Sequence, residues 1–524
     1  MALFETIIIF LAVAFIFTKA LGILPQRFVK NYGRIVANAR EAKGLSGKQL
    51  AALLKTTEEN ISLIESGKKH PSNDIAREIE KHLGIVILRF NTFFVFTLVK
   101  TTSVSFFDRF KKHTRFLNFL SDSGLFFGFG TMAFDYLFAR KRKPAGRILL
   151  LSLSFLLLFV FFNTVLLAFL ENPFIAEYNT ALSAGFALAG FAGFVVLSLF
   201  AYGAFILINV LAGQQVCPGV APLIPGVELP NVPVVLPLHA WLSFVIILLV
   251  HEGMHGIVAR KNNYRVKSAG LLLFGFLPVG AFVEPDDEQI KKGDEKEAVR
   301  IFSAGASANL FTTAFLIAVI VVFLSVFFIP FIAPWQNGIL KEGIEYFVVS
   351  GIQERLELCG RVYPGSAFGV LQEKSRVLLV NGEPIAVGKP LNIKPREPLE
   401  LTVIENGTEV KKTLTPTEFG GFGFSFSPKL REGFVFPQAF NHYLAARDFL
   451  ASFFFWLIVL NFLVAIVNFL PIEPFDGGKI SKILLYPYFG FLKMNREETQ
   501  KFIGRVLLWA IAIVLLINAV PLFL

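Results

Sequence analysis

Residues 238–259 read LHAWLSFVIILLVHEGMHGIVA, an apolar run with one polar cluster, His251-Glu252-Gly253-Met254-His255. On a helix, positions i and i+4 share a face, so both imidazoles can reach one metal ion. Zinc lowers the pKa of a bound water to about 7, and Glu252 lies where it can accept that water's proton. Ionisable groups inside a membrane segment are costly and usually functional. The pattern predicts a catalytic zinc site in a membrane helix. The alternative is a polar helix end at the interface, beside Arg260 and Lys261.

The composition places this cluster in a membrane protein. Of the 524 residues 54% are hydrophobic, 17% are charged and 61 are Phe, and the apolar residues gather in long uncharged runs. These runs exclude a purely soluble enzyme and a disordered chain. The net charge of +11 fits loops that collect Lys and Arg on the cytoplasmic side. Two cysteines exclude a multi-bridge framework, while a bridge between Cys217 and Cys359 is compatible with the sequence without being required by it.

Apolar runs long enough to cross a bilayer predict about seven or eight transmembrane helices. The first run has its basic residues, such as Lys19 and Arg27, late or after it, which predicts an uncleaved anchor rather than a signal peptide. A further run at 124–139 is short for a span. The predicted spans are 3–24, 148–170, 181–211, 238–259, 301–332, 444–470 and 500–523.

A catalytic zinc ion needs a third protein ligand and an open position. The best candidate lies in residues 468–478, NFLPIEPFDGG, where Asp476 follows an apolar span. Proline and glycine break the helix there and allow a carboxylate to turn inward. Glu473 is the rival ligand, and chemistry alone leaves the choice between the two open.

At this point the sequence resembles the site-2 protease family of intramembrane zinc proteases. The resemblance rests on HEGMH in a membrane helix, on residues 468–477 as N-x-x-P-x-x-x-x-D-G, and on residues 305–309, GASAN. It covers roughly residues 238–524. The resemblance implies that His251, His255 and Asp476 bind zinc and that Glu252 is the catalytic base. It also implies that Asn309 and Asn468 support the substrate or the oxyanion, with ordinary helix–helix hydrogen bonding as the alternative.

The substrates implied by the resemblance are transmembrane helices of other membrane proteins. A helical peptide hides its carbonyl groups in i→i−4 hydrogen bonds, so it must unwind locally before attack. The glycine-broken stretch at 269–283 is too short to span and predicts a re-entrant hairpin whose strand edge could receive the unwound segment. The alternative is a simple packing loop.

Residues 345–418 resemble a PDZ domain of the kind these proteases carry. The resemblance rests on residues 362–367 (VYPGSA) and 377–385 (VLLVNGEPI). It implies a filter that excludes bulky substrate ectodomains, with a folded spacer as the alternative.

Residues 34–84 resemble the helix-turn-helix of the Cro and lambda-repressor group. The resemblance rests on residues 38–46 (NAREAKGLS), 49–51 (QLA) and 60–72 (NISLIESGKKHPS). Ser46 and Ser72 are predicted helix caps. The presumed recognition helix starts with Glu58 and Glu59, which oppose contact with phosphate. Its expected partner is DNA or a cytoplasmic regulator.

The sequence thus predicts a polytopic α-helical membrane protein with an all-α helix-turn-helix domain and a small β-rich PDZ-like domain. The positive-inside rule places the first of these domains in the cytoplasm and the second outside the cell membrane. A span at 124–139 would leave Arg140-Lys141-Arg142-Lys143 outside, against that rule. The predicted segments are an anchor (1–25), the helix-turn-helix domain (26–84), a cytoplasmic strand and interfacial-helix segment (85–123), accessory helices (124–237), two core parts (238–344 and 419–524) and the PDZ-like domain (345–418).

Three functions remain in competition. The leading one is an intramembrane zinc endopeptidase acting in regulated intramembrane proteolysis. The second is a membrane-tethered helix-turn-helix transcriptional regulator with an inactive protease-like core, and the third is a transporter or receptor that uses bound zinc.

Overall fold

The protein, described by a computed structural model, forms two compact units built from separated stretches of the chain. The first comprises Met1–Ser198, Leu238–Thr313 and Trp456–Ile511; the second comprises Leu199–Pro237, Ala314–Phe455 and Ala512–Leu524. The structure describes residues 32–85, 88–102, 104–168, 173–229, 231–275, 277–394, 396–417 and 420–524. The predicted anchor at 1–25 lies outside the described residues.

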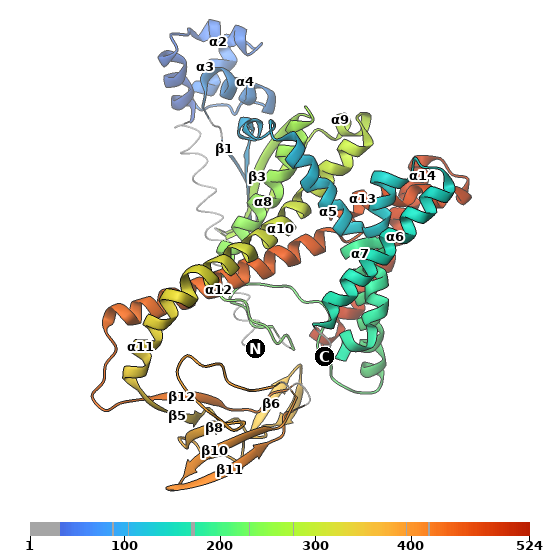
Figure 1. Cartoon of the computed structure of the whole chain (residues 1–524). Helices are drawn as coiled ribbons and strands as arrows, with labels where there is room; N and C mark the ends of the chain where they lie inside the picture. The colour runs from blue at the N-terminus through green and yellow to red at the C-terminus, as the bar shows by residue number, and fades with distance from the viewer. Residues whose placement is uncertain are drawn as a thin grey trace. The chain divides into compact units, whose positions relative to one another are not determined.

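The described part of the first unit begins with an all-helical domain (Figure 1). Ser46 caps its second helix in a reciprocal capping box with Gln49, and Ser72 caps its last helix, as the sequence predicted. Buried aliphatic side chains, among them Leu50, Ile61 and Ile79, form its core. The helices are 32–42, α2 (Gly47–Leu53), α3 (Glu58–Glu65) and α4 (Asn73–Leu83).

A four-stranded antiparallel sheet joins two distant stretches of the first unit. Its order is β1-β2-β3-β4, and β4 is an edge strand. The predicted hairpin at 269–283 forms β3 and β4, and it pairs with the strands predicted after the helical domain. Gly270 lets the strands approach, since a Cβ there would lie 2.2 Å from the Val99 carbonyl oxygen. The strands are β1 (Leu88–Phe93), β2 (Phe96–Thr101), β3 (Val266–Phe274) and β4 (Leu277–Pro285).

The helical domain docks on this sheet through α4. Arg77 donates a hydrogen bond to the Lys267 carbonyl oxygen at 3.0 Å. Thr102, directly after β2, donates to the buried Glu80 carboxylate at 2.7 Å. These contacts fix α4 against the base of the sheet, while α3 makes none of them.

Six helices among the described residues are long and apolar enough to cross a membrane. Each coincides with a predicted span. They are α6 (Pro144–Leu167), α7 (Pro173–Leu211), α8 (Ala240–Lys261), α10 (Glu295–Phe323) with η3 (Leu324–Ile332) and α11 (Ala333–Gly343), α12 (Gln438–Asn468), and α14 (Arg496–Ala519) with η5 (Val520–Leu522).

The run at 124–139 is not one of these six helices. It belongs to α5 (Thr114–Phe134), which breaks at Gly130 and continues into η2 (Asp135–Ala139). Within the predicted strand and interfacial-helix segment (85–123), the residues from Thr114 onward belong to α5, and the short η1 (Ser105–Arg109) precedes it.

Helix α7 reverses direction at Gly190. Gly190 has φ 57° and ψ −148°, outside helical space. A Cβ on Gly185 would lie 3.2 Å from the Gly193 carbonyl oxygen, whereas positions eight apart on one straight helix are about 12 Å apart. Residues 173–189 and the stretch after Gly190 therefore form a helical hairpin rather than one span.

A buried carboxylate organises one end of the first unit. Asp135 accepts hydrogen bonds from Arg147 at 2.7 Å and from Tyr488, in η4 (Tyr486–Leu492), at 2.9 Å. Burial raises the pKa of Asp135, but the bonds from Arg147 and Tyr488 outweigh burial and hold that pKa below its usual range. The ionised form is therefore the one that the fold stabilises.

Further ion pairs connect other helices of the first unit. Arg300 near the start of α10 forms a bidentate pair with Asp122 of α5, and Arg260 at the end of α8 forms one with Asp108. Arg496 at the start of α14 pairs with Glu295 at the start of α10. The turn 140–143 before α6 is held by the same network, because Arg140 contacts Asp135 and the Leu484 carbonyl oxygen. These contacts place the basic turn beside α13 in the first unit; the side of the membrane on which the turn lies stays a prediction.

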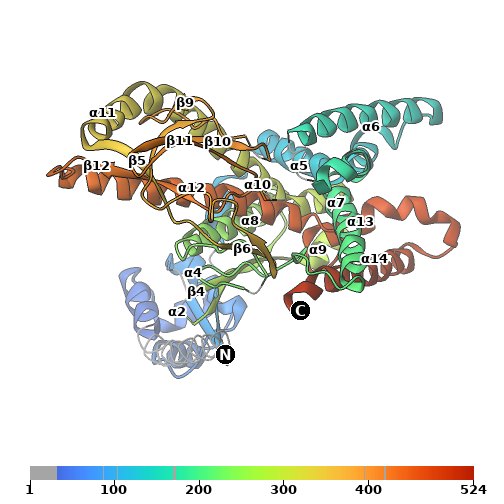
Figure 2. The same cartoon turned by 90° about the horizontal axis from the view of Figure 1, so that it is seen from below.

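The second unit holds a sheet of order β11-β10-β8-β5-β12, with β9 pairing on β8 (Figure 2). Strand β12 lies beyond residue 418, where the PDZ-like domain was expected to end. A disulfide joins Cys217 to Cys359, in the turn between β6 and β7. The strands are β5 (Ile344–Ser350), β6 (Arg355–Leu358), β7 (Arg361–Pro364), β8 (Arg376–Val380), β9 (Glu383–Pro384), β10 (Leu399–Glu405), β11 (Thr408–Leu414) and β12 (Ser425–Leu430).

Replacing Asp135 by Asn should destabilise the first unit in a pH-dependent way. Breaking a buried charge pair costs about 3–5 kcal/mol, so the Tm in detergent should fall clearly at neutral pH. The folded-state pKa lies below the unfolded value of about 3.9, so the carboxylate stabilises the fold above that pH. This stabilisation is lost as the pH falls through the folded-state pKa, and the Tm difference from wild type should shrink there.

The matched control is Asp287→Asn, because Asp287 is exposed at the start of α9 (Asp287–Lys292). Its Tm should follow that of wild type at each pH. A difference for Asp135→Asn that stays constant down to about pH 3 would contradict the role of the ionised carboxylate.

Candidate metal centre

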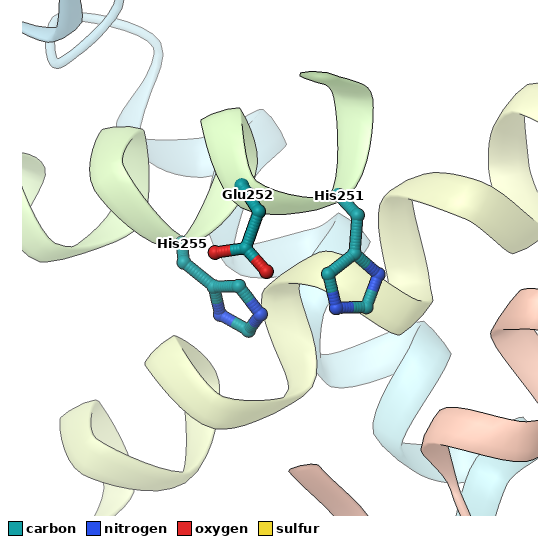
Figure 3. Close-up of side chains that lie close together, drawn as sticks. All are labelled: His251, Glu252 and His255. Carbon is teal, nitrogen blue, oxygen red and sulfur yellow. The ribbon is translucent and has the colours of Figure 1, made fainter. Parts of the chain in front are cut away.

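Helix α8 brings His251, Glu252 and His255 together (Figure 3). One ligand atom from each lies within 4.8 Å of the others. Both histidines are buried, and their ring centroids are 5.0 Å apart. The one-turn spacing places the two imidazoles on one face, whereas Glu252 projects beside that face.

Asp476 reaches this pair from more than 200 residues away in the sequence. It is the first residue of α13 (Asp476–Leu485), and its Oδ2 lies 3.2 Å from Nε2 of His251 and 3.1 Å from Nε2 of His255. The three side chains therefore converge on one point. Glu473 lies elsewhere, since its carboxylate accepts from Lys482 at 2.6 Å and is 56% exposed.

Two glycines allow the loop before α13 to present Asp476. A Cβ on Gly477 would lie 2.3 Å from the Phe469 carbonyl oxygen. A Cβ on Gly478 would lie 2.4 Å from the Glu473 backbone nitrogen. Any larger residue at either position would push the turn away from the end of α12, and Asp476 with it.

Hydrogen bonds at Nδ1 orient the two imidazoles. His255 Nδ1 lies 2.7 Å from the Ile301 carbonyl oxygen, which can only accept, so this nitrogen carries the proton. Nε2 of His255 lies 3.1 Å from Asp476 Oδ2 and, in the neutral imidazole, offers its lone pair to a metal ion. This is the arrangement of a metal-binding histidine held by a backbone carbonyl.

Asn309 of α10 lies at Nδ1 of His251, as the Ile301 carbonyl lies at Nδ1 of His255. Its Nδ2 lies 3.1 Å from His251 Nδ1, and its Oδ1 is buried without a partner in the described structure; turning the amide by 180° would bring the oxygen to Nδ1. A metal on Nε2 requires a proton on Nδ1, and the amide oxygen is the group that can accept it. Asn309 therefore suits a role in fixing the metal-binding tautomer of His251.

Gly305 supplies the space that an ion would need. A Cβ at this position of α10 would lie 2.4 Å from Nε2 of His255 and 2.6 Å from Nε2 of His251. Zinc binds histidine nitrogen at about 2.0–2.1 Å, so a Cβ would take nearly the volume that the ion fills. Two imidazoles and one carboxylate with one open position are the donor set of catalytic zinc. The residues present therefore fit this metal.

Glu252 is held by the sheet. Its Oε2 accepts a hydrogen bond from the Val283 backbone N–H of β4 at 2.9 Å. Val283 is on the edge strand, so this N–H points away from β3 and towards α8. The carboxylate therefore stands between the candidate metal centre and the β4 edge, whose Val283 N–H it occupies.

The structure separates the two predicted asparagines. Asn309 contacts a metal-ligand candidate, whereas the described hydrogen bond of Asn468 goes to the Val464 carbonyl oxygen of its own helix at 2.9 Å. The sequence reasoning missed the roles of Gly305, Ile301 and Val283. Small residues at a helix crossing were the available signal for Gly305, but a carbonyl or an N–H gives no signal in a side-chain pattern.

Comparison with known proteins agrees with this geometry. A model of peptidase family M50 matches residues 239–514, and a helix-turn-helix model matches residues 36–86. An uncharacterized protein of Methanocaldococcus jannaschii is 26% identical over 275 residues, which are 51% of this chain and 61% of that protein. The chain thus spans about three fifths of the length of the relative that it matches.

Gly305→Ala should remove metal from the purified protein. The added methyl group would occupy the ion's volume, so we expect bound zinc to fall from near one per chain to near zero while the fold persists. The measurement is elemental analysis of protein purified without chelators. Gly253→Ala is the matched control, since a Cβ there meets nothing within 4 Å. Equal zinc in Gly305→Ala and wild type would place the ion elsewhere.

Asn309→Ala should weaken zinc binding about 10- to 100-fold, the usual effect of removing a hydrogen-bond partner of a metal ligand. Asn309→Asp keeps an acceptor for the His251 Nδ1–H and should retain tighter binding. Competition with a chelator of known affinity measures both. Asn468→Ala should bind zinc as wild type does. The same loss in the Ala and Asp variants of Asn309 would argue against the tautomer role.

Proposed function

The chain belongs to peptidase family M50, and we propose that it is an intramembrane zinc endopeptidase that cleaves transmembrane segments of membrane proteins. The zinc ligands in this proposal are His251, His255 and Asp476. The catalytic base is Glu252. The observation that carries the proposal is the convergence of Asp476 on the two imidazoles, within a group of helices apolar enough to span a bilayer.

The described residues suggest how the reaction proceeds. Bound zinc would polarise the scissile carbonyl and lower the pKa of the attacking water to about 7. Glu252 accepts the proton of that water and passes it to the leaving amine. The Ile301 carbonyl and Asn309 keep both imidazoles in the tautomer that presents Nε2. The burial of His251 and His255 excludes bulk water from the remaining surface of the site.

Strand β4 is suited to hold an unwound substrate. As the edge strand it has backbone groups that no described strand pairs, and alternate residues present them on the same side. An extended peptide that adds to this edge runs past Val283, where Glu252 is anchored. Substrate pairing and positioning of the base would therefore occur at the same place.

The positions of charged residues and of the disulfide support an assignment of the two soluble domains to opposite sides of the membrane. Arg140 and Arg147 lie at Asp135, and the positive-inside rule assigns this helix end to the cytoplasm together with the helix-turn-helix domain. Independently, the Cys217–Cys359 disulfide in the second unit fits an oxidising compartment. The β-rich domain would then lie outside, where it could act as a PDZ-like filter for substrate ectodomains.

The docking of the helix-turn-helix domain supports a role for this domain in regulating proteolysis. It docks through α4, and its contacts end on β2 and β3, the strands that carry β4. The presumed recognition helix α3 makes none of these contacts, so DNA or a cytoplasmic protein could bind while the domain stays docked. Glu58 and Glu59 at the start of α3 are exposed and favour a protein over DNA.

Glu252→Gln should abolish cleavage while zinc stays bound. The amide keeps the size of the side chain but cannot accept a proton, so the rate should fall by at least about 10²-fold. The assay uses wild type and variant in liposomes with a panel of fluorescent single-span helices, and zinc is measured on the same samples. The control is Glu288→Gln, an exposed carboxylate on α9.

Two results would decide against the proposal. One is a well-folded wild type that holds no zinc. The other is cleavage that persists in Glu252→Gln. The second candidate, a membrane-tethered regulator with an inactive core, requires no cleavage by wild type together with salt-dependent binding of duplex DNA by the full chain.

A further inference from the structure

A pocket of about 500 Å³ lies between α14 and the loop that carries Asp476. One wall is a single face of α14. The other consists of the loop after α12 and the first turns of α13. The lining residues are Pro471, Ile472, Glu473, Gly478, Lys482, Gln500, Lys501, Gly504, Arg505 and Leu508.

The pocket is cationic. Three of its side chains are basic, Lys482, Lys501 and Arg505, and one is acidic, Glu473. The acid pairs with Lys482 at 2.6 Å. Lys501 lies 2.7 Å from Glu497, whose side chain is 78% exposed. Because an exposed pair is worth little, the pocket keeps an excess of positive charge.

Arg505 carries most of that excess. Among the residues that the structure describes it has no ion-pair partner. It lies nine residues into α14, where the apolar part of this candidate span begins. Arg505 is exposed at the edge of this apolar part, and a cation there that lacks a protein counterion favours an anion at this pocket.

The backbone leaves room for such an anion. Gly504 stands in a helix interior, where glycine costs about 1 kcal/mol relative to alanine. A Cβ there would lie 3.2 Å from Cδ of Lys482. The glycine therefore lets the Lys482 side chain pass close to α14 and brings its charge towards those of Lys501 and Arg505.

We propose that this pocket binds the phosphate headgroup of an anionic phospholipid. Basic pockets between membrane helices at the polar ends of spans suit such headgroups. The lipid source is favoured over free phosphate by the neighbouring surface. Leu508 at the rim of the pocket is 42% exposed, and Trp509, the next residue on α14, is 67% exposed; both suit an acyl chain. The headgroup would brace Ile472, Glu473 and Gly478, which flank Asp476.

Trp509 allows a direct binding test on the full chain. It lies one helical turn after Arg505, and the chain has only three other tryptophans, at 241, 335 and 456, which are replaced by Phe. The protein is reconstituted in phosphatidylcholine vesicles that contain a fixed fraction of lipid with brominated acyl chains. That lipid is either phosphatidylglycerol or phosphatidylcholine. Brominated phosphatidylglycerol should quench Trp509 more strongly.

Variants that remove one charge each then test whether the pocket causes the preference for phosphatidylglycerol. Arg505→Gln and Lys501→Gln should each weaken the preference for phosphatidylglycerol about fivefold, the value for one Lys or Arg near an anionic lipid surface, and reduce the excess quenching accordingly. Arg505→Lys should retain it. Lys48→Gln, an exposed cation of α2 in the helical domain, should leave it unchanged.

Three outcomes would overturn the proposal. The first is equal quenching by the two lipids in wild type. The second is an excess that survives in both Gln variants of the pocket. The third is an excess that a large concentration of inorganic phosphate abolishes, which would assign the pocket to a free anion. None of these readouts requires peptidase activity, so this test is independent of the proposed function.

Discussion

The candidate centre depends on the close approach of α10 to α8 at Gly305. Without a side chain at that position the two imidazoles and Asp476 share a volume the size of one ion. The same approach places the Ile301 carbonyl and Asn309 at the two Nδ1 atoms, one on each side of Gly305 along α10. One helix therefore supplies the space for a metal and the hydrogen bonds that prepare both histidines for it.

Elsewhere in the first unit the fold satisfies buried charge in pairs. Asp135, Asp122 and Asp108 each meet an arginine in a bidentate contact, and each contact joins different helices. Such pairs favour one arrangement of the helices, because an arrangement that leaves one charge buried without its partner would cost free energy. At the candidate metal centre one carboxylate, that of Asp476, faces the imidazoles of both His251 and His255. A carboxylate facing two imidazole lone pairs is the arrangement that a cation completes.

The candidate metal ligands could be predicted because they lie in two short motifs made of residue types that bind metal ions. The choice of Asp476 over Glu473 could not, on chemistry alone, because it depends on Lys482 holding Glu473 away. The reversal at Gly190 and the break at Gly130 escaped notice because glycine is common in apolar runs and only backbone geometry reveals a turn. The disulfide was allowed but undetermined, since two cysteines can pair only if the fold brings them together.

The loop 471–478 joins two kinds of chemistry. On one side it ends in Asp476 at the histidine pair, and on the other it forms a wall of the cationic pocket. Gly477 packs against the carbonyls of Phe469 and Leu470 just after α12, and Gly478 packs against Ile472 and Glu473, so tightly that the loop has little freedom to move alone. A displacement of Glu473 by a group in the pocket would therefore also displace Asp476, which lies three residues further along the chain. A carboxylate that must stay about 3 Å from two imidazoles tolerates little displacement, so what fills the pocket bears directly on the geometry of the metal centre.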